Sequence, residues 1–188
     1  MTVLNNLNLK QMNLEKIAIG NNPPEDINVI IEIPMNSAEP IKYEFDKEAR
    51  MLVVDRISNT PMFYPCNYGF TPNTLSDDGD PLDVLVVSRY PFLSGSMINT
   101  RPIGVLIMED ESGKDEKIIA VPNHKITDYY DNVKDISDLP VSLINEIKFF
   151  FETYKNLYSN KWTKVDSVRG ANEAKEYILS SIKNVEKK

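Results

Sequence analysis

The spacing of apolar residues changes once along the chain, and this change sets the class of fold. Up to about residue 121, apolar residues form short runs or alternate with polar ones, as in β-strands. From Pro140 to Tyr158 they recur instead at steps of three and four residues, the period of an amphipathic helix. Strands gathered early and helices gathered late predict an α+β fold with a mainly β core. We expect a closed or nearly closed antiparallel barrel with the helices against its outside.

The sequence predicts six strands, followed by a pair of helices. The strands are expected at 27–33, 42–46, 51–57, 83–88, 103–108 and 117–121. The helices are expected at 140–158 and about 171–184. The segment 61–72 has three prolines and four aromatic residues, so we expect an ordered loop packed on the core.

Length and composition favour one globular domain over residues 1–188. Hydrophobic residues make up 41% and charged residues 26% of the chain, as in ordinary soluble proteins. The net charge of −7 argues against a general binder of nucleic acid or anionic membranes, which needs a positive face. No apolar run reaches the ~18 residues of a membrane span, and the start lacks the pattern of a secretion signal. We therefore expect a cytoplasmic protein without a nucleic-acid or membrane partner.

The single cysteine, Cys66, excludes an internal disulfide and suits a reducing cytoplasm. A nucleophilic cysteine would need a base, and the chain has one histidine, His124. The sequence therefore favours Cys66 as a small buried residue of the core.

The most unusual stretch is Asp78-Gly79-Asp80-Pro81-Leu82-Asp83-Val84, which places three carboxylates within six positions. Charges this close repel one another, unless a multivalent cation neutralises them or the turn directs them apart into water. Oxygen ligands without clustered His or Cys favour Mg²⁺, Mn²⁺ or Ca²⁺ over copper or zinc. A second acidic stretch at 109–116, expected as a hairpin-like loop, could complete such a metal site.

Two simpler interpretations compete with a metal site. An Asp/Gly/Pro cluster between apolar runs is usually a solvated turn. An EF-hand also has closely spaced aspartates, but positions 6 and 12 counted from Asp78 hold Asp83 and Arg89 instead of Gly and Glu. The EF-hand is therefore excluded, while the turn stays open.

Several other polar residues can be interpreted in two ways. Glu32, inside an apolar strand, either points to water at a sheet edge or is held in a polar site. Tyr64 and Tyr68 are either packing residues or hydroxyl donors to an anion. Tyr154 lies on the apolar stripe of the first helix, where core packing is the default.

The heptad resembles the signature of the family I inorganic pyrophosphatases of bacterial type. Further stretches resemble that family in the same order: 29–34, 40–44, 54–56, 62–69, the run 110–117 with its two aspartates and lysine, and 150–155. The resemblance covers about residue 13 to the end of the chain, and residues 1–12 extend beyond the usual bacterial start. It implies a five-stranded OB-like closed barrel with flanking C-terminal helices. It also implies Mg²⁺-dependent hydrolysis of pyrophosphate to two phosphates by a cytoplasmic homohexamer.

The resemblance also implies roles for individual residues. Metal ligands would be Asp78, Asp83, Asp115, Asp110 and Glu44, with Asp83 bridging two activating metals and Glu32 in the same acidic cavity. Asp80 would be the general base. The phosphates would be gripped by Lys42, Arg56, Tyr68, Lys117, Tyr154 and Lys155.

The implied cofactor is Mg²⁺, several ions per active site, with Mn²⁺ or Zn²⁺ as substitutes and Ca²⁺ as an inhibitor. Pyrophosphate is heavily anionic, so its hydrolysis needs both an activated water and neutralised phosphates. Basic residues in a site crowded with carboxylates suit that requirement. Some hexameric relatives place histidines on the long helix at the subunit contact, where this chain has Lys148 and Thr153.

Two functions from other classes compete with the enzyme. A single-strand nucleic-acid binder would need a basic groove with stacking aromatics, against which the acidic balance weighs. A Ca²⁺-stabilised structural domain would explain the aspartates, but not Lys42, Arg56 and Lys155 beside them. Turnover in the presence of Mg²⁺ separates these functions from the enzyme.

Overall fold

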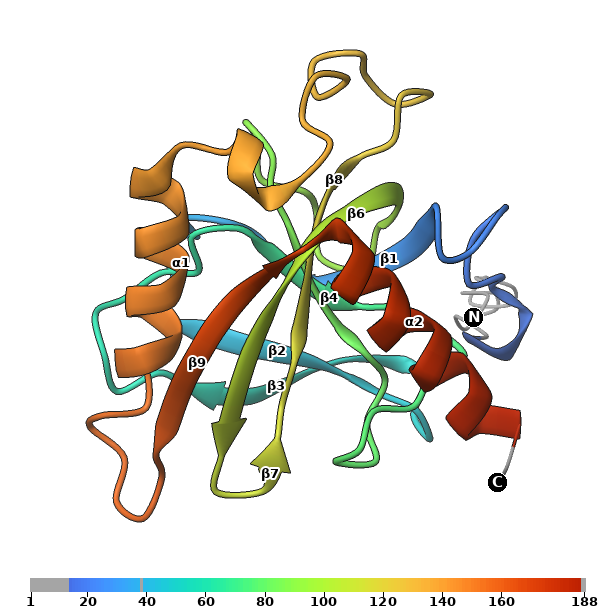
Figure 1. Ribbon diagram of the computed structural model, residues 1–188. Coiled ribbons are helices and arrows are strands. Elements are labelled where there is room, and N and C mark those ends of the chain that lie inside the picture. The colour runs from blue at the N-terminus through green and yellow to red at the C-terminus, as the bar shows by residue number, and fades with distance from the viewer. Residues whose placement is uncertain (1–13, 38, 187–188) are drawn as a thin grey trace, which may run out of the picture.

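The computed structural model describes residues 14–37 and 39–186 (Figure 1). The expected N-terminal extension, residues 1–12, lies outside these ranges. The strands are β1 (Ile27–Ile33), β2 (Ile41–Asp46), β3 (Met51–Ile57), β4 (Asn67–Phe70), β5 (Asp83–Val86), β6 (Met97–Asp110), β7 (Gly113–Lys114), β8 (Lys117–Pro122) and β9 (Thr163–Gly170). The helices are α1 (Val141–Thr153) and α2 (Ala171–Glu186), with short 3-10 turns at Leu14–Lys16 and Ile136–Asp138. No helix within the described ranges combines the length and apolar character that crossing a bilayer requires.

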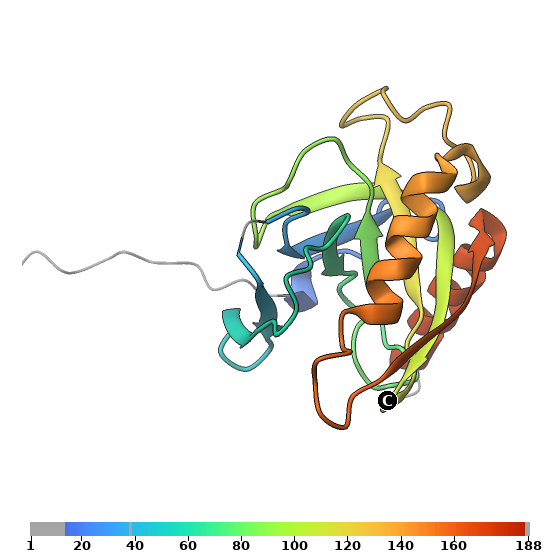
Figure 2. The ribbon, with the colours of Figure 1, turned by 90° about the vertical axis from the view of Figure 1, so that its left-hand side faces the viewer.

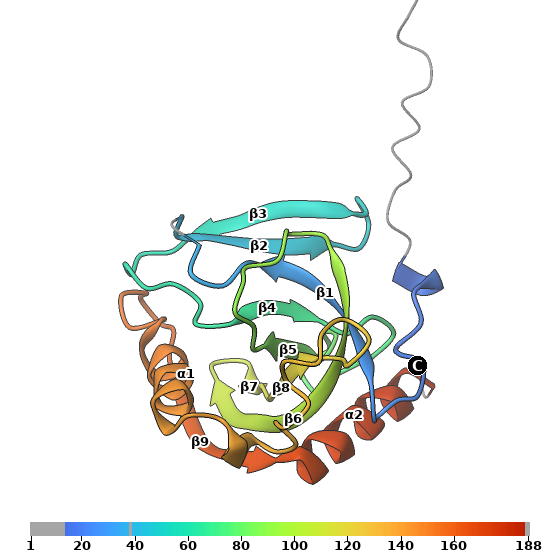
Figure 3. The same cartoon turned by 90° about the horizontal axis from the view of Figure 1, so that it is seen from above.

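The strand pairings of the main sheet form a closed path (Figure 3). Strand β1 pairs with β4, β4 with β5, β5 with β8, β8 with β6, and β6 pairs back with β1. Strands β7 and β9 also pair with β6. The expectation of an antiparallel sheet is wrong for one pair, because β5 and β8 are parallel. Their long connection through β6 makes that direction possible.

Strand β6 serves several partners because it is long and irregular. It spans 14 residues, and its register against β8 shifts between Pro102 and Gly104. A Cβ atom at Gly104 would lie 2.8 Å from the Arg169 carbonyl oxygen and 2.9 Å from the Ile136 Cβ atom. Glycine therefore permits the close approach of β9 and of the 3-10 turn at this point.

Each helix covers a different region of the sheet (Figure 1). Helix α1 buries Ile147, Phe150 and Phe151 in one apolar cluster, and α2 buries Ala174 and Ile178 in another. The predicted spacing of apolar residues therefore marks the buried faces correctly. Helix α1 ends at Thr153, five residues before the predicted end, and the chain continues in turns.

Strands β2 and β3 form a separate two-stranded sheet, here called the hairpin sheet (Figure 2). Phe45 packs with Ile30 of β1 and Phe70 of β4, which attaches the hairpin sheet to the main sheet. Most of β3 is partly or fully exposed, whereas every residue of β1 is buried. The hairpin sheet is thus supported mainly from one side.

Three strands were not predicted, one of them the two-residue β7 in the acidic stretch that was expected to be a hairpin-like loop. Strand β4 lies within the segment 61–72, which was expected to be a loop, and β9 lies before the second helix. Cys66 is a buried free thiol just before β4, which confirms the expectation of a core residue. Burial raises its pKa to about 12.

Candidate active site

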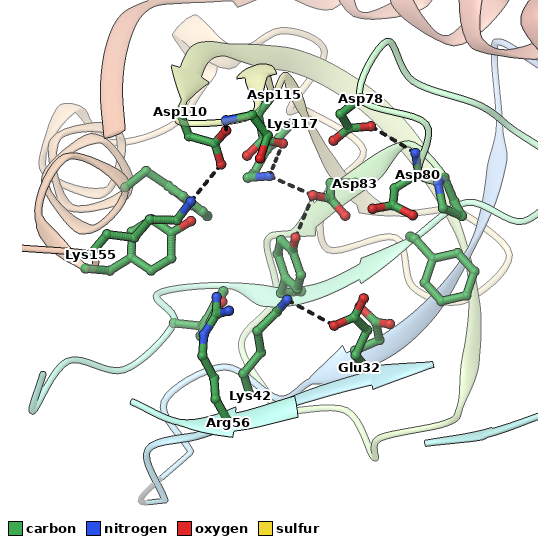
Figure 4. Close-up of a pocket in the computed structure, with 18 of the residues that line it drawn as sticks. Glu32, Lys42, Arg56, Asp78, Asp80, Asp83, Asp110, Asp115, Lys117 and Lys155 are labelled. Atoms are coloured by element: carbon green, nitrogen blue, oxygen red, sulfur yellow. Dashed lines mark hydrogen bonds and ion pairs between the residues drawn. The ribbon is translucent and has the colours of Figure 1, made fainter. Parts of the chain in front are cut away.

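A cavity of about 280 Å³ opens between the hairpin sheet and one end of the main sheet (Figure 4). All the residues that the sequence singled out as site residues line it: Glu32, Lys42, Glu44, Arg56, Tyr68, Asp78, Asp80, Asp83, Asp110, Asp115, Lys117, Tyr154 and Lys155. They come from both sheets, from two loops and from the segment after α1. The fold therefore collects into one place residues that are far apart in the chain.

The acidic heptad forms one wall of the cavity. The turn is closed by a hydrogen bond from the Ser76 amide to the Asp80 carbonyl at 2.7 Å, and Gly79 adopts a φ of 93°. The Asp78 carboxylate accepts a bond from the Asp80 amide at 3.0 Å. As Figure 4 shows, Asp78, Asp80 and Asp83 lie next to one another on this wall. The turn is thus solvated at one side and faces the cavity at the other.

The buried ammonium group of Lys117 forms ion pairs with two of the aspartates. The parallel pairing of β5 with β8 places Asp83 opposite Lys117. The Lys117 Nζ atom lies 2.6 Å from Asp83 Oδ2 and 2.7 Å from Asp115 Oδ1, with the side chain only 2% exposed. Burial alone lowers the pKa of Lys117, but Asp83 and Asp115 outweigh it and hold the pKa well above its usual value. Lys117 is therefore a permanent cation of the site.

A second lysine binds the acidic end of β6. Lys155 Nζ lies 2.6 Å from Asp110 Oδ2 and 3.1 Å from Glu111 Oε2. Burial raises the pKa of Asp110, but hydrogen bonds from Lys155 and from the Ser112 amide outweigh burial, so the net shift is downward. The early end of α1 is what allows this contact, because Lys155 leaves the helical path and enters the cavity.

Other carboxylates of the cavity are shifted in the opposite direction. Burial, followed by the charges of Asp115 and Asp80, raises the pKa of Asp78. Burial also raises the pKa of Glu32 to about 8, although the Phe45 amide donates a hydrogen bond to it at 2.8 Å. Glu32 is 6% exposed, so the polar-site interpretation is correct and the sheet-edge interpretation is wrong. These upward shifts show that burial and crowding disfavour the charged carboxylates.

The hairpin sheet supplies the opposite, more basic wall. Lys42 of β2 and Arg56 of β3 are paired across the two strands. Both lie near Asp55, with Lys42 Nζ at 3.4 Å and Arg56 Nη1 at 3.2 Å from its Oδ2 atom. Lys42 is also 3.4 Å from Glu44. These pairs are partly exposed, and they leave both cations on the cavity surface.

Tyrosines close the inner end of the cavity. The Tyr68 hydroxyl donates to Asp83 Oδ2 at 2.6 Å, and the Tyr64 ring packs on Tyr68 at 5.1 Å between centroids. Tyr154 stacks on Phe150 at 5.2 Å and also lines the cavity. Tyr68 thus packs in the core and also donates its hydroxyl to a carboxylate, so both interpretations of Tyr68 hold. Tyr154 packs as expected, and its contact with phosphate stays a prediction.

Comparison with known proteins identifies the family. The model of the inorganic pyrophosphatase family matches residues 29–186. The chain belongs to the inorganic pyrophosphatase family. The resemblance seen in its motifs is thereby confirmed.

Individual relatives of the family agree over nearly the whole chain. An inorganic pyrophosphatase of Yersinia pestis is 56% identical over 94% of this chain and 100% of its own length. One of Brucella melitensis is 52% identical over the same shares. Among solved structures, an inorganic phosphatase of Anaplasma phagocytophilum has a TM-score of 0.89 at 48% identity, covering 90% of this chain and 99% of its own. The inorganic pyrophosphatase of Helicobacter pylori has a TM-score of 0.86 at 46% identity, covering 92% and 99%.

Sequence reasoning missed four charged residues near the site. Glu111 holds Lys155 and lies 3.6 Å from Lys161, while Lys47 is 3.4 Å from Asp80. Asp55 pairs with the two cations of the hairpin sheet. Their signal was weak: Glu111 and Asp55 lie inside recognised motifs but Lys47 and Lys161 lie outside them, and each looks like an ordinary surface charge.

The chemistry of the cavity fits a hard divalent cation. Eight carboxylates and six basic side chains line it. The acidic residues can therefore offer a metal ion only oxygen ligands. Within the described residues, no three His, Cys, Asp or Glu side chains are grouped so as to hold a metal ion as they stand. Lys117 and Lys155 instead bind three of the aspartates. The donor type and the excess of negative charge nevertheless suit a hard divalent cation.

Proposed function

We propose that this chain hydrolyses inorganic pyrophosphate to two orthophosphates in a Mg²⁺-dependent reaction, with Asp80 as the general base. One observation carries the proposal: a single cavity has an acidic wall of aspartates facing a wall with Lys42 and Arg56. A metal site alone would not need the cations, and an anion site alone would not need the aspartates. A substrate that is an anion bound with metal needs both.

Asp78, Asp83 and Asp115 would hold the resident Mg²⁺, with Asp110 and Glu44 available to metal that arrives with substrate and Glu32 in the same cavity. When bound, Mg²⁺ would lower the pKa of the attacking water and neutralise some of the substrate charge, with Mn²⁺ or Zn²⁺ as substitutes. Tyr68 and Lys117 both bind Asp83 Oδ2 and so orient its carboxylate. The protein thus fixes the ligand positions through buried hydrogen bonds.

The cations orient the substrate and offset charge on the leaving phosphate. Arg56 offers a planar fork of N–H groups that suits two phosphate oxygens at once. Lys42 lies across the strand pair from Arg56, and Lys155 enters the cavity next to Asp110, with Tyr154 also lining it (Figure 4). Negative charge develops on the leaving group as the bridging P–O bond breaks, so these cations favour the transition state.

Asp80 accepts the proton of the attacking water. Its side chain is 69% exposed, so its carboxylate is well solvated and placed at the mouth of the cavity. The water oxygen forms the new P–O bond, one proton passes to Asp80, and the bridging oxygen leaves with the second phosphate. Asp78 and Asp83 on either side have other assigned roles, which leaves Asp80 to act as a base.

We further propose the finer features that the family resemblance implies. The path of strand pairings supports an OB-like closed barrel forming one domain. A cytoplasmic homohexamer is proposed from the resemblance, with Lys148 and Thr153 of α1 at the expected subunit contact. The net charge of −7 supports the absence of nucleic-acid and membrane partners. Light scattering at micromolar concentration with Mg²⁺ tests the hexamer, and a monomer would contradict it.

A phosphate-release assay tests the proposed function. It compares pyrophosphate with ATP as substrate, each in the presence of Mg²⁺ and of Ca²⁺. We expect pyrophosphate to be cleaved with Mg²⁺ and Ca²⁺ to inhibit, because the larger ion binds oxygens in looser geometry and polarises water less. Comparable rates with both ions would contradict the mechanism. Comparable rates with both substrates would contradict the substrate assignment.

A further inference from the structure

Tyr158 joins two segments of the chain that are distant in sequence. It lies in the connection between α1 and β9, which also carries Lys155. Its hydroxyl accepts a hydrogen bond from the Asn59 amide at 3.1 Å and donates to the Ile57 carbonyl at 3.5 Å. Ile57 ends β3 and Asn59 follows it closely, so the tyrosine attaches this connection to the hairpin sheet.

The ring of Tyr158 lies against Arg56. The guanidinium carbon is 5.8 Å from the ring centroid, within the range of a cation–π contact. Such a contact uses the flat face of the guanidinium. A guanidinium stacked by its flat face keeps its in-plane N–H groups available, and those of Arg56 that are not paired with Asp55 could bind phosphate oxygens.

Arg56 needs a contact from outside its own strand to be placed accurately. Its ion pair at 3.2 Å is with Asp55, the preceding residue, which moves with β3. That pair cannot fix the distance between the hairpin sheet and the acidic wall. Tyr158 can, because Lys155 in the same connection is bound to Asp110 of β6.

The space behind Arg56 is nearly filled. A second cavity there measures about 30 Å³, and both Arg56 and Tyr158 line it. Such a volume has room for about one water, so side chains nearly fill the space that Arg56 and Tyr158 share. The tyrosine ring is one of the groups that limit that room.

We propose that Tyr158 is a positioning residue that holds the Arg56 guanidinium toward the substrate and ties it to the Lys155 side of the cavity. This inference rests on the proposed function. The alternative is that Tyr158 is a packing residue of a surface connection, without effect on Arg56. The two differ in kinetics rather than in stability.

Steady-state pyrophosphate hydrolysis with Mg²⁺ tests the proposal in Tyr158→Leu and Tyr158→Phe. We expect Tyr158→Leu to lower kcat/KM about two- to fivefold, with a raised KM, because the cation–π contact is lost. Tyr158→Phe keeps the ring, so its loss should be smaller. The matched control is Tyr129→Leu, since Tyr129 stacks on Arg89 at 4.7 Å but is not among the residues lining the cavity. This control should retain the kcat/KM of the parent.

A double mutant decides whether Tyr158 acts through Arg56. In an Arg56→Lys background, Tyr158→Leu should cause a smaller fold-loss than in the parent, because the flat guanidinium is already absent. An equal fold-loss in both backgrounds, or parental kinetics in Tyr158→Leu, would overturn the inference. If Tyr158→Leu does not fold, Tyr158→Met replaces it as a side chain of similar bulk without an aromatic face. An inactive parent would instead contradict the proposed function itself.

Discussion

The two walls of the cavity are built in different ways. The acidic wall stands partly on the main sheet, where Asp83 begins β5 beside the fully buried Val84 and Asp110 ends β6. The basic wall stands on the hairpin sheet, where the side chains of Lys42 and Arg56 are 22% and 29% exposed. Strand register therefore places Asp83 opposite Lys117 at the base of the acidic wall, whereas a few side-chain contacts set the position of the cations on the hairpin sheet.

This difference matches what each wall is proposed to bind. A metal ion needs ligands at nearly fixed distances, which a buried sheet provides. A phosphate group must enter, react and leave. The cations proposed to clamp it, Lys42 and Arg56, therefore benefit from a support that can adjust. Glu32 bound to the Phe45 amide, Lys47 near Asp80, and Tyr158 bound to Asn59 are the polar links that hold the clamp in place.

The largest expected effect separates two residues of the acidic wall. Asp80→Asn keeps the shape of the side chain but removes its basicity, so kcat should fall by ~10²–10⁴ without recovery at higher Mg²⁺. Asp78→Asn should instead weaken metal binding, and added Mg²⁺ should restore some of its activity. Mg²⁺ titration of pyrophosphate hydrolysis measures both. The reverse pattern of rescue would mean that the two roles are exchanged.

The second effect concerns the free energy of unfolding. It tests whether the main sheet, which carries part of the acidic wall, is more deeply buried than the hairpin sheet, which carries the basic wall. Leu85 on β5 is 0% exposed and Val54 on β3 is 58% exposed. Leu85→Ala should lower the free energy of unfolding by about 2–5 kcal/mol, because it leaves a cavity in the main sheet. Val54→Ala should change it by less than about 0.5 kcal/mol. Chemical denaturation compares the two, and similar losses would remove the distinction between the walls.

A smaller effect is expected at the clamp. Arg56→Lys keeps the charge but loses the fork that binds two oxygens, so kcat/KM should fall about tenfold. Stability should stay close to that of the parent, because Arg56 is partly exposed. Steady-state kinetics and a melting curve measure the two quantities. Parental kinetics would mean that Arg56 is only a surface charge of the hairpin sheet.

The smallest effect follows from Cys66, which lies on the buried side of the main sheet. Its pKa in the folded protein is raised to about 12, so the unfolded thiol ionises first as the pH rises. The contribution of the protonated thiol to the free energy of unfolding is fully present below the pKa of the unfolded state. It is lost as the pH rises from that value towards the pKa of the folded state. From about pH 8 to about pH 9.5, the parent should lose about 1 kcal/mol more unfolding free energy than Cys66→Ala. Equal losses in denaturation at the two pH values would mean that Cys66 is open to water.

The sequence alone was sufficient for features that depend on local pattern. The apolar runs at β1, β5 and β8 and the helical spacing of α1 and α2 were recognisable because each buries a continuous face. The heptad and its companion motifs were recognisable because they occur in the order found in the inorganic pyrophosphatase family. The family followed from them, and the comparisons confirmed it.

The tertiary structure decided features that depend on distant partners. Strand β9 has an alternating, largely polar sequence, and it is a strand because β6 offers it a long edge. Strand β4 contains a glycine and follows a proline-rich stretch, so its pairing with β1 and β5 could not be read from its own residues. Local propensity is weak in both segments, and hydrogen bonds to neighbouring strands outweigh it.

The composition of the cavity could be predicted, but its internal contacts could not. All the expected site residues line it, while the placement of Lys117 between Asp83 and Asp115 depends on the parallel pairing of β5 and β8. The contact of Tyr158 with Arg56 likewise depends on how the connection after α1 folds against the hairpin sheet. A motif specifies which chemical groups a site needs. Their distances arise only when strands and loops far apart in the chain pack together, because those contacts have no counterpart in local sequence.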